Sequence, residues 1–357
     1  MFNFIINGTC SKGCSFCFTE DDARLQNSLG EMTLEYVNKL LDYYEFDSKK
    51  GSIESNVRIV GGEPTQHSNF IGIIDTIIKR GLRINLVSNF LWGDYIRDYL
   101  VENIRSFNWM LPNSAELDEK NRLKLWKKNY LSIYEAYENS WGFEEVCDRE
   151  GENICTCGLK LYLSITISRD YKERNHFEYI KWLCSQIPNK VKAIRIGLDL
   201  TGTYLLNDKE LGKELIKISK FGEVNNILVS SDCQIPPCLW EGDTQEVIMM
   251  NSNQLATFNN RKTDLTCGNL PIDVFPDGTS SNCYPLKGAV NVDVFDVDGS
   301  NKIKTLEKIY NKKYVANYIK YDLPDDCLNC VFYLAGCNGI CGGCLHGEVM
   351  KKDFKYE

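Results

Sequence analysis

The feature that most constrains the fold is an alternation of short apolar runs and longer amphipathic segments through the first two thirds of the chain. The short runs have the length and composition of buried strands, and the longer ones repeat apolar residues with the period of a helix packed on one face. Strands are expected at 2–7, 57–60, 83–87, 107–110, 161–167 and 192–198. Because strands that alternate with helices build parallel sheets through right-handed crossovers, we expect an α/β fold.

A helix is expected after each of these strands. The helical segments are 32–46, Phe70 to Gly81, 94–105, 116–138, 175–187 and 208–220. Six strand–helix units are too few for a closed eight-stranded barrel and fit a partial (β/α)6 TIM-like barrel, with a further candidate strand at 227–230. The loops that follow the strands would then form the active face.

The pattern changes after about residue 231, where turns rich in Pro, Gly, Asp and Cys replace the alternation. We therefore place a domain boundary near residue 230, with a partial barrel in 1–230 and a small cysteine-rich domain in 231–357. A polar insertion at 139–158 interrupts the barrel pattern. It carries Cys147, Cys155 and Cys157, for which the sequence assigns no role.

Charge and hydropathy exclude several classes of protein. The net charge of −8 argues against nonspecific binding to nucleic acid or to an anionic membrane. No apolar run approaches the ~18 residues that a membrane span needs, and the stretch FNFII near the start is too short for a signal peptide. We therefore expect a cytoplasmic protein that binds neither nucleic acid nor membrane.

Cysteine is the residue type that stands out in the composition, with 16 in the chain. Cytosolic thiols stay reduced, so a dense pattern there is more typical of metal binding or catalysis than of disulfides. Three cysteines lie within residues 10–17 and five within 327–344, whereas none lies between Cys17 and Cys147. Clustering at both ends indicates metal sites.

The first group, GTCSKGCSFCFTE, places Cys10, Cys14 and Cys17 on the loop after the first expected strand. A closed zinc site takes four ligands, and disulfides take cysteines in pairs. Three thiolates can instead hold three irons of a [4Fe–4S] cluster and leave the fourth iron open to another ligand. The motif therefore predicts such a cluster at the active face of the barrel.

This loop, with Phe16 just before its last cysteine, resembles the cluster loop of the radical S-adenosylmethionine (SAM) superfamily. After the second expected strand, the sequence GGEP is similar to the segment of that family that contacts the amino group of SAM. Glycines let a backbone approach a ligand closely, and a carboxylate suits an ammonium group. The residues so assigned are Gly61, Gly62, Glu63 and Pro64.

The resemblance implies further contacts with SAM. Ser88 and Asn89 follow the third expected strand, where the family often has a polar pair near the ligand. Ser164 on the fifth strand resembles a serine that helps to hold the SAM carboxylate, and Arg174 or Arg169 would pair with that carboxylate. For each of them, an ordinary strand-end polar residue or a solvated arginine is the competing interpretation.

The C-terminal cysteines allow two interpretations. Cys327-x2-Cys330 and Cys341-x2-Cys344 have the spacing of a small zinc ribbon, which leaves other cysteines unused. The wider pattern looks like the SPASM-type auxiliary domain of radical SAM enzymes that modify peptides, which carries two more [4Fe–4S] clusters. That resemblance implies an outer cluster on Cys327, Cys330, Cys337 and Cys344, and an inner cluster on Cys267, Cys283 and Cys341.

Three departures from the SPASM pattern are visible. The spacing between Cys330 and Cys337 is one residue longer than usual, the final cysteine follows after only two residues, and no cysteine lies just before Cys267. The inner cluster would therefore have an open iron, or Cys233 or Cys238 would complete it.

The resemblance implies a reaction in which SAM chelates the open iron and is cleaved by one electron to methionine and a 5′-deoxyadenosyl radical. The radical then abstracts a hydrogen atom. Members with this auxiliary domain commonly act on peptides, so we expect maturation of a ribosomally synthesised peptide by a cross-link or another C–H modification.

The implied cofactors are three [4Fe–4S] clusters and SAM. The implied partners are a precursor peptide or protein and a reductant such as flavodoxin or ferredoxin. Because this sequence begins at the first expected strand, we expect a leader to bind elsewhere, either along the insertion and the KLWKKNYL helix or through a separate leader-binding protein.

Other functions stay open at this point. Sulfatase-maturing enzymes have a similar domain order but place an aspartate after the cysteine that is here Cys283, where this chain has Tyr284. Peptide epimerisation would use Cys233 or Cys238 as the hydrogen-atom donor. A non-catalytic iron–sulfur electron carrier would gain nothing from an open iron.

Metal analysis distinguishes the two interpretations of the C-terminal cysteines. Three clusters predict about twelve irons per chain after anaerobic reconstitution. One cluster with a zinc ribbon predicts about four irons and bound zinc. We expect the first result by elemental analysis of the purified protein, and bound zinc at one equivalent would contradict it.

Overall fold

The computed structural model of the chain describes residues 2–14, 30–46, 56–117, 119–140, 161–167, 175–198, 209–231, 272–281, 292–297 and 302–310. The barrel strands are β1 (Phe2–Ile5), β2 (Asn56–Val60), β3 (Arg83–Ser88), β4 (Phe107–Pro112), β5 (Leu163–Ile167), β6 (Ala193–Leu198) and β7 (Leu228–Ser231). The helices between them are α2 (Leu34–Tyr43), α3 (Phe70–Lys79), α4 (Asp94–Glu102), α5 (Lys120–Ser140), α6 (His176–Gln186) and α7 (Lys209–Val224). Later elements are β8 (Ile272–Val274), β9 (Thr279–Ser281), β10 (Val292–Asp293) and a helix over 302–310.

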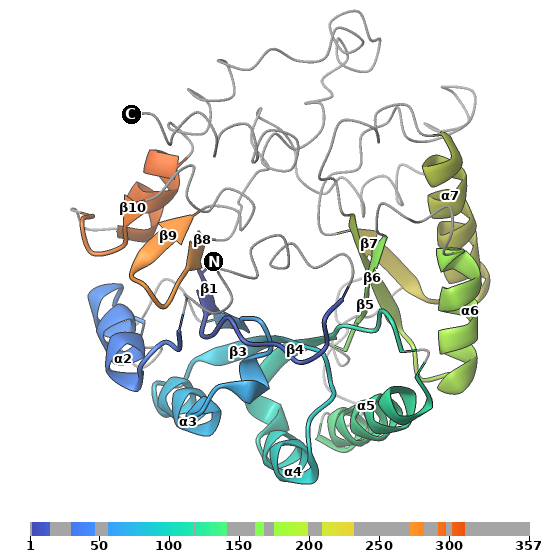
Figure 1. Cartoon of the computed structure of the whole chain (residues 1–357), viewed down its shortest axis with the longest axis horizontal. Helices are drawn as coiled ribbons and strands as arrows, with labels where there is room; N and C mark the ends of the chain where they lie inside the picture. The colour runs from blue at the N-terminus through green and yellow to red at the C-terminus, as the bar shows by residue number, and fades with distance from the viewer. Residues whose placement is uncertain are drawn as a thin grey trace, which may run out of the picture.

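The strands form an arc with the helices on its outer side (Figure 1). One sheet has the order β10-β9-β8-β1-β2-β3-β4, and a second has the order β5-β6-β7. Two parallel bridges join the β4 and β5 regions: Met110 of β4 pairs with Leu161, two residues before β5, and Asn113, just after β4, pairs with Ser164 of β5. Neighbouring strands from β8 through β1 to β4, and from β5 to β7, are parallel. The predicted α/β fold with a partial barrel is confirmed.

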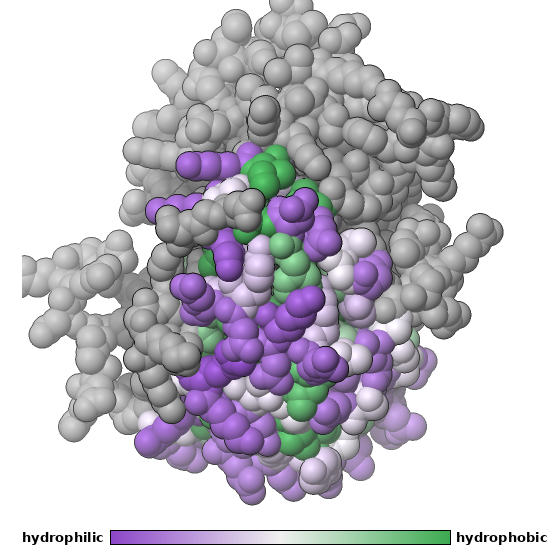
Figure 2. Space-filling view, turned by 90° about the vertical axis from the view of Figure 1, so that its left-hand side faces the viewer, coloured by the Kyte–Doolittle hydropathy of each residue, from purple (hydrophilic) through white to green (hydrophobic). Residues whose placement is uncertain are grey.

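The helices form where the sequence combines caps with an apolar stripe. Thr33 caps α2 by accepting a hydrogen bond from the Tyr36 amide at 3.1 Å, and Val37, Leu40 and Leu41 of that helix are buried. Figure 2 shows the side of the molecule that carries α2, where the described surface is mainly hydrophilic with small separate apolar areas. In the described part of the chain, no helix is both long and apolar enough to cross a membrane.

Helix α5 begins later than the predicted residue 116. Glu116 has a positive φ of 52°, which a helix does not allow. The hydroxyl of Tyr179 on α6 donates to the Ser114 carbonyl at 2.6 Å and accepts from the Leu117 amide at 3.1 Å. The residues between β4 and α5 are therefore held against α6 in a turn.

Side chains alternate between the two faces of β1. Phe2 packs outward, with its ring centroid 4.6 Å from that of Tyr44 at the end of α2. Asn3 faces the inside of the arc, where it lies in register with Arg58 of β2 and Asp273 of β8. The Asn3 amide donates to the Asp273 carboxylate at 2.6 Å, and both residues are buried. The inside of the barrel therefore contains a polar layer.

The segment with β8 to β10 belongs to the same folded body as the first strand–helix unit. The Tyr43 hydroxyl on α2 lies 2.7 Å from the Phe295 carbonyl and 2.8 Å from the Val297 carbonyl. The Tyr44 hydroxyl donates to the Val294 carbonyl at 2.5 Å. These contacts tie the described part of the predicted C-terminal region to the barrel. The boundary near residue 230 stays a prediction.

The buried Asp273 generates a pH-dependent prediction. Burial raises the pKa of Asp273 to about 7 from 3.8, although the Asn3 hydrogen bond and the Arg58 charge oppose this rise. The folded protein therefore keeps a proton on Asp273 between about pH 4 and 7 that the unfolded chain releases. Stability should fall as the pH rises through this window.

We expect Asp273→Asn to reduce the loss of unfolding free energy between pH 4 and 8 by up to about 4 kcal/mol, measured by urea unfolding. Asp293→Asn on β10 is the matched control, because Asp293 is exposed. Equal pH dependence in wild type and Asp273→Asn would contradict the prediction.

Candidate functional site

The loop that leaves β1 carries the first two cysteines of the predicted cluster motif. Cys14 is 6% exposed and Cys10 is partly buried, whereas Cys17 lies outside the described residues. The loop is joined to the turn after β2 by hydrogen bonds from the Gly62 amide to the Asn7 carbonyl and from the Glu63 amide to the Thr9 carbonyl, at 2.9 and 2.7 Å. The cysteine loop and the GGEP turn therefore lie side by side.

The two glycines of this turn are required by its closeness to the cysteine loop. A Cβ atom on Gly61 would lie 2.3 Å from the side-chain oxygen of Asn7. One on Gly62 would lie 2.4 Å from the Thr9 carbonyl oxygen and 2.7 Å from that of Gly8. The second contact is with backbone, which cannot rotate away. A side chain at residue 62 would therefore displace the cysteine loop.

Glu63 points into the protein, where it is 1% exposed. Its carboxylate accepts hydrogen bonds from the Thr65 hydroxyl at 2.6 Å, the Ser88 hydroxyl at 2.8 Å and the Asn89 backbone amide at 2.6 Å. Burial raises the pKa of Glu63, and these hydrogen bonds oppose the rise. This geometry gives Glu63 and Ser88 a role in joining the turn to the end of β3. Their contact with SAM stays a prediction.

Two asparagine side chains approach the cysteine sulfurs. The side-chain amide nitrogen of Asn89, which directly follows β3, lies 4.0 Å from Cys10 Sγ. The side-chain amide nitrogen of Asn113, which directly follows β4, lies 3.8 Å from Cys14 Sγ. Asn89 was predicted as a SAM contact, whereas the sequence analysis missed Asn113. Its position directly after an expected strand was the signal that could have identified it.

Lys12 is a second residue that the sequence analysis missed. It lies between the two cysteines, is 3% exposed, and donates from Nζ to the Asn113 carbonyl at 2.9 Å. Burial lowers the pKa of Lys12, while the nearby charges of Cys14, Glu116 and others oppose this change. A lysine inside a cysteine motif is a visible signal, but only the fold shows that its ammonium group is buried.

The remaining predicted site residues divide into two groups. Ser164 lies at the same edge of the barrel, because it forms a bridge with Asn113 and its carbonyl accepts from the Ser114 amide at 2.9 Å. Pro64 begins a short 3-10 helix, Pro64–Gln66, and is buried. The others lie outside the described residues: Arg169, Arg174, Cys233, Cys238, Cys267, Cys283, Tyr284, Cys327, Cys330, Cys337, Cys341 and Cys344. The insertion thiols Cys147, Cys155 and Cys157 lie outside them as well.

The described groups fit an iron–sulfur cluster by their chemistry. A cluster held by thiolates is an anion that is stabilised by hydrogen-bond donors to its sulfur ligands. Two amide groups and one buried ammonium group surround the described thiols. The side-chain oxygen of Asn7 is buried beside the GGEP turn and has no hydrogen-bond partner among the described residues, so it is an acceptor that suits a ligand with N–H groups.

The closeness of the turn and the loop predicts a specific effect of Gly62→Ala. We expect it to lower the free energy of unfolding by about 1–3 kcal/mol, because the new methyl group collides with backbone. It should also remove the iron of this site from the reconstituted protein. Gly93→Ala is the matched control, because its Cβ would meet nothing within 4 Å and should change stability by no more than about 0.5 kcal/mol. Equal iron content and stability in the two variants would contradict this view of the turn.

Comparison with known proteins shows what the first part of the chain and its fold are similar to. Residues 4–134 match the model of the radical SAM superfamily. The fold is similar to the crystal structure of Streptococcus suis SuiB bound to S-adenosylmethionine, with a TM-score of 0.57 and 14% identity over 96% of this chain and 73% of that chain. It is also similar to SuiB bound to the precursor peptide SuiA, with a TM-score of 0.58 and 13% identity over 96% of this chain and 71% of that chain. No curated protein matches the sequence of this chain. The match to the radical SAM superfamily model covers residues 4–134, and the likeness to SuiB is a likeness of fold.

Proposed function

We propose that the chain is a radical SAM enzyme that abstracts a hydrogen atom from a peptide and thereby matures a ribosomally synthesised precursor. The observation that carries the substrate class is the likeness, over 96% of this chain, to a structure of SuiB with its precursor peptide bound. The radical SAM domain and the paired cysteine loop and GGEP turn support the type of chemistry.

In this proposal, Cys10, Cys14 and Cys17 hold the cluster, and the GGEP turn with Asn89 and Ser164 borders the SAM site. When bound, the cluster and SAM supply a 5′-deoxyadenosyl radical. The chain's own residues hold the reacting groups at the strand ends. The turn can do this because its backbone is tied to the loop at Asn7 and Thr9.

The auxiliary clusters form the second part of the proposal. Cys327, Cys330, Cys337 and Cys344 would hold an outer cluster, and Cys267, Cys283 and Cys341 an inner one, with Cys233 or Cys238 as a further ligand or hydrogen donor. The support for this part is the cysteine spacing. A flavodoxin or ferredoxin would supply electrons, and a separate protein could present the leader of the precursor.

The inner face of the barrel carries polar and aromatic side chains. Along β5, the outward residues are buried, whereas Ser164 and Thr166 stay partly exposed on the other face. The ring of Trp109 lies on this face, with the guanidinium carbon of Arg58 4.9 Å and that of Arg195 5.8 Å from its centroid. Polar and aromatic groups suited to a peptide therefore line the inside of the strands.

The test uses the anaerobically reconstituted protein with SAM and dithionite. We expect 5′-deoxyadenosine from the wild type and none from Cys14→Ala, because three thiolates are needed to leave one iron open. Cys184→Ala on α6 is the matched control, since burial raises the pKa of that thiol to about 12 and it lies in a helix away from the strand ends.

The peptide substrate is tested with a short precursor encoded beside the gene. A change in peptide mass that requires SAM and Cys14 supports the proposal. Formation of 5′-deoxyadenosine without any change in such a peptide, together with oxidation of a sulfatase Cys or Ser, would favour the sulfatase-maturing type instead. A wild-type protein that forms no 5′-deoxyadenosine would be an electron carrier.

A further inference from the structure

We propose that Asn89 and Asn113 are positioning residues that donate N–H···S hydrogen bonds to Cys10 and Cys14 and so raise the reduction potential of the cluster that these cysteines hold. The inference rests on the proposed function, because it requires a cluster at this loop. It goes beyond that function by assigning the control of the cluster's potential to two named side chains.

The two asparagines occupy equivalent places on neighbouring strands. Asn89 follows Ser88, the last residue of β3, and Asn113 follows Pro112, the last residue of β4; Ser88 and Pro112 are partners in the parallel ladder. From these places the amide nitrogens lie 4.0 Å from Cys10 Sγ and 3.8 Å from Cys14 Sγ. Cys10 therefore lies near a side-chain amide from the end of β3, and Cys14 lies near one from the end of β4.

The direction of each amide group is set by the backbone. The Leu91 amide donates to Asn89 Oδ1 at 2.7 Å, and the Ala115 amide donates to Asn113 Oδ1 at 3.2 Å. A backbone N–H can pair only with the oxygen end of an asparagine side chain, so the NH₂ end must point the other way. In both residues that other direction leads to a cysteine sulfur.

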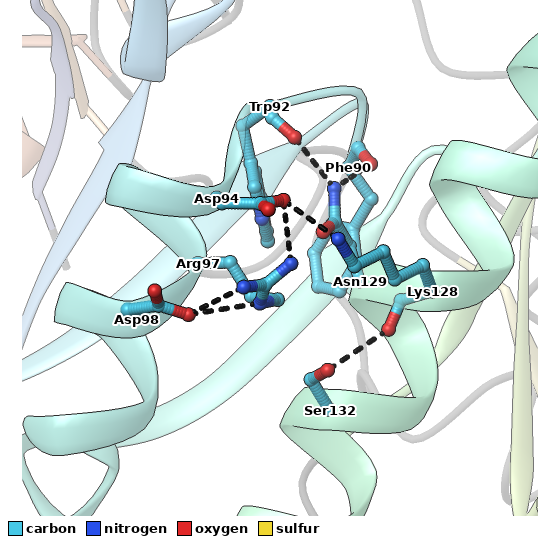
Figure 3. A network of polar contacts seen from close by, with 8 residues as sticks. All are labelled: Phe90, Trp92, Asp94, Arg97, Asp98, Lys128, Asn129 and Ser132. Carbon is cyan, nitrogen blue, oxygen red and sulfur yellow. Dashed lines mark hydrogen bonds and ion pairs between the residues drawn. The ribbon is translucent and has the colours of Figure 1, made fainter.

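The loop that carries Asn89 is held by Glu63 after β2 and by Asn129 on α5. The Asn89 backbone amide donates to Glu63, and Phe90 takes a left-handed φ of 59°. Asn129 on α5 is fully buried, and its side-chain amide donates to the carbonyls of Phe90 and Trp92, both at 2.9 Å (Figure 3). A loop fixed in this way keeps the amide of Asn89 in place beside Cys10.

Figure 3 also shows how α4 and α5 are connected next to this loop. Asp94, at the start of α4, pairs with Arg97 of the same helix at 2.6 Å and with Lys128 of α5 at 2.8 Å. Asn129, which holds the loop, is the next residue after Lys128. Because Asp94 and Lys128 are exposed, we assign these pairs the alignment of the two helices and little stability.

Asn113 is held by the cysteine loop itself. Lys12 Nζ donates to the Asn113 carbonyl at 2.9 Å, and the Asn113 backbone amide donates to the Ser88 carbonyl at 2.7 Å. Lys12 thus brings the loop to β4 from a position between the two cysteines. The backbone bond to Ser88 joins the ends of β3 and β4, which carry the two donors.

The electrostatic consequence follows from the charge of the cluster. Reduction adds one electron and makes the cluster and its thiolate ligands more negative. A hydrogen-bond donor to a ligand sulfur stabilises this more negative state and raises the reduction potential. A residue that only caps a turn would not change the potential, so the potential separates a positioning role from a merely structural one.

The test replaces each asparagine with serine. A serine hydroxyl can still accept the bond from the backbone amide two residues later, but it does not reach the sulfur. Asn103→Ser is the matched control, because its amide donates to the Tyr99 carbonyl at the end of α4. The potential is measured by EPR-monitored titration of the reconstituted protein, following the signal that changes when SAM is added.

We expect Asn89→Ser and Asn113→Ser each to lower the equilibrium constant for reduction about tenfold, which for one electron corresponds to about 59 mV. Asn103→Ser should titrate like the wild type. Potentials equal to the wild type in both serine variants, with the cluster present, would overturn the inference. Loss of the cluster from both variants would also overturn it, since both asparagines would then be needed for assembly. A wild-type protein without any signal that responds to SAM would instead contradict the proposed function.

Discussion

The buried carboxylate of Glu63 is the interaction on which the arrangement of the site depends. It connects the turn after β2 to the end of β3 through the Ser88 hydroxyl and the Asn89 backbone amide. A buried carboxylate is costly unless several donors compensate for the lost water. The donors are available only when the turn and the strand end lie together, so the stability of this part of the fold and the geometry of the site have the same cause.

From Glu63 the connections continue along the edge of the sheet. The GGEP turn holds the cysteine loop through the Asn7 and Thr9 carbonyls, and Lys12 of that loop holds Asn113 at the end of β4. The buried ammonium group of Lys12 lies near the negative charges of Glu63 and of the described thiols. The ends of four parallel strands therefore form one polar network, which would keep the ligands of the proposed cluster in a constant geometry.

The sequence predicted the barrel elements because their signals are local. The strand expected at 83–87 is Arg83–Ser88, and the one expected at 192–198 is Ala193–Leu198. Helix α5 was placed too early, because the turn at Glu116 depends on the hydroxyl of Tyr179, which is distant in sequence. The pairing of β8 with β1 was not predicted for the same reason: a three-residue strand carries little pattern, and its partner is 270 residues away at Asn3 and Asp273.

The sequence by itself determined the alternation that builds a parallel sheet, the three-cysteine loop after β1 and the glycines of the turn after β2. These features are read from spacing and residue type, which a single chain segment carries. Only the tertiary structure decided which groups surround the cysteines. Asn89 and Asn113 reach Cys10 and Cys14 because parallel strands end at one edge of the sheet, and that edge gathers residues that are far apart in the chain.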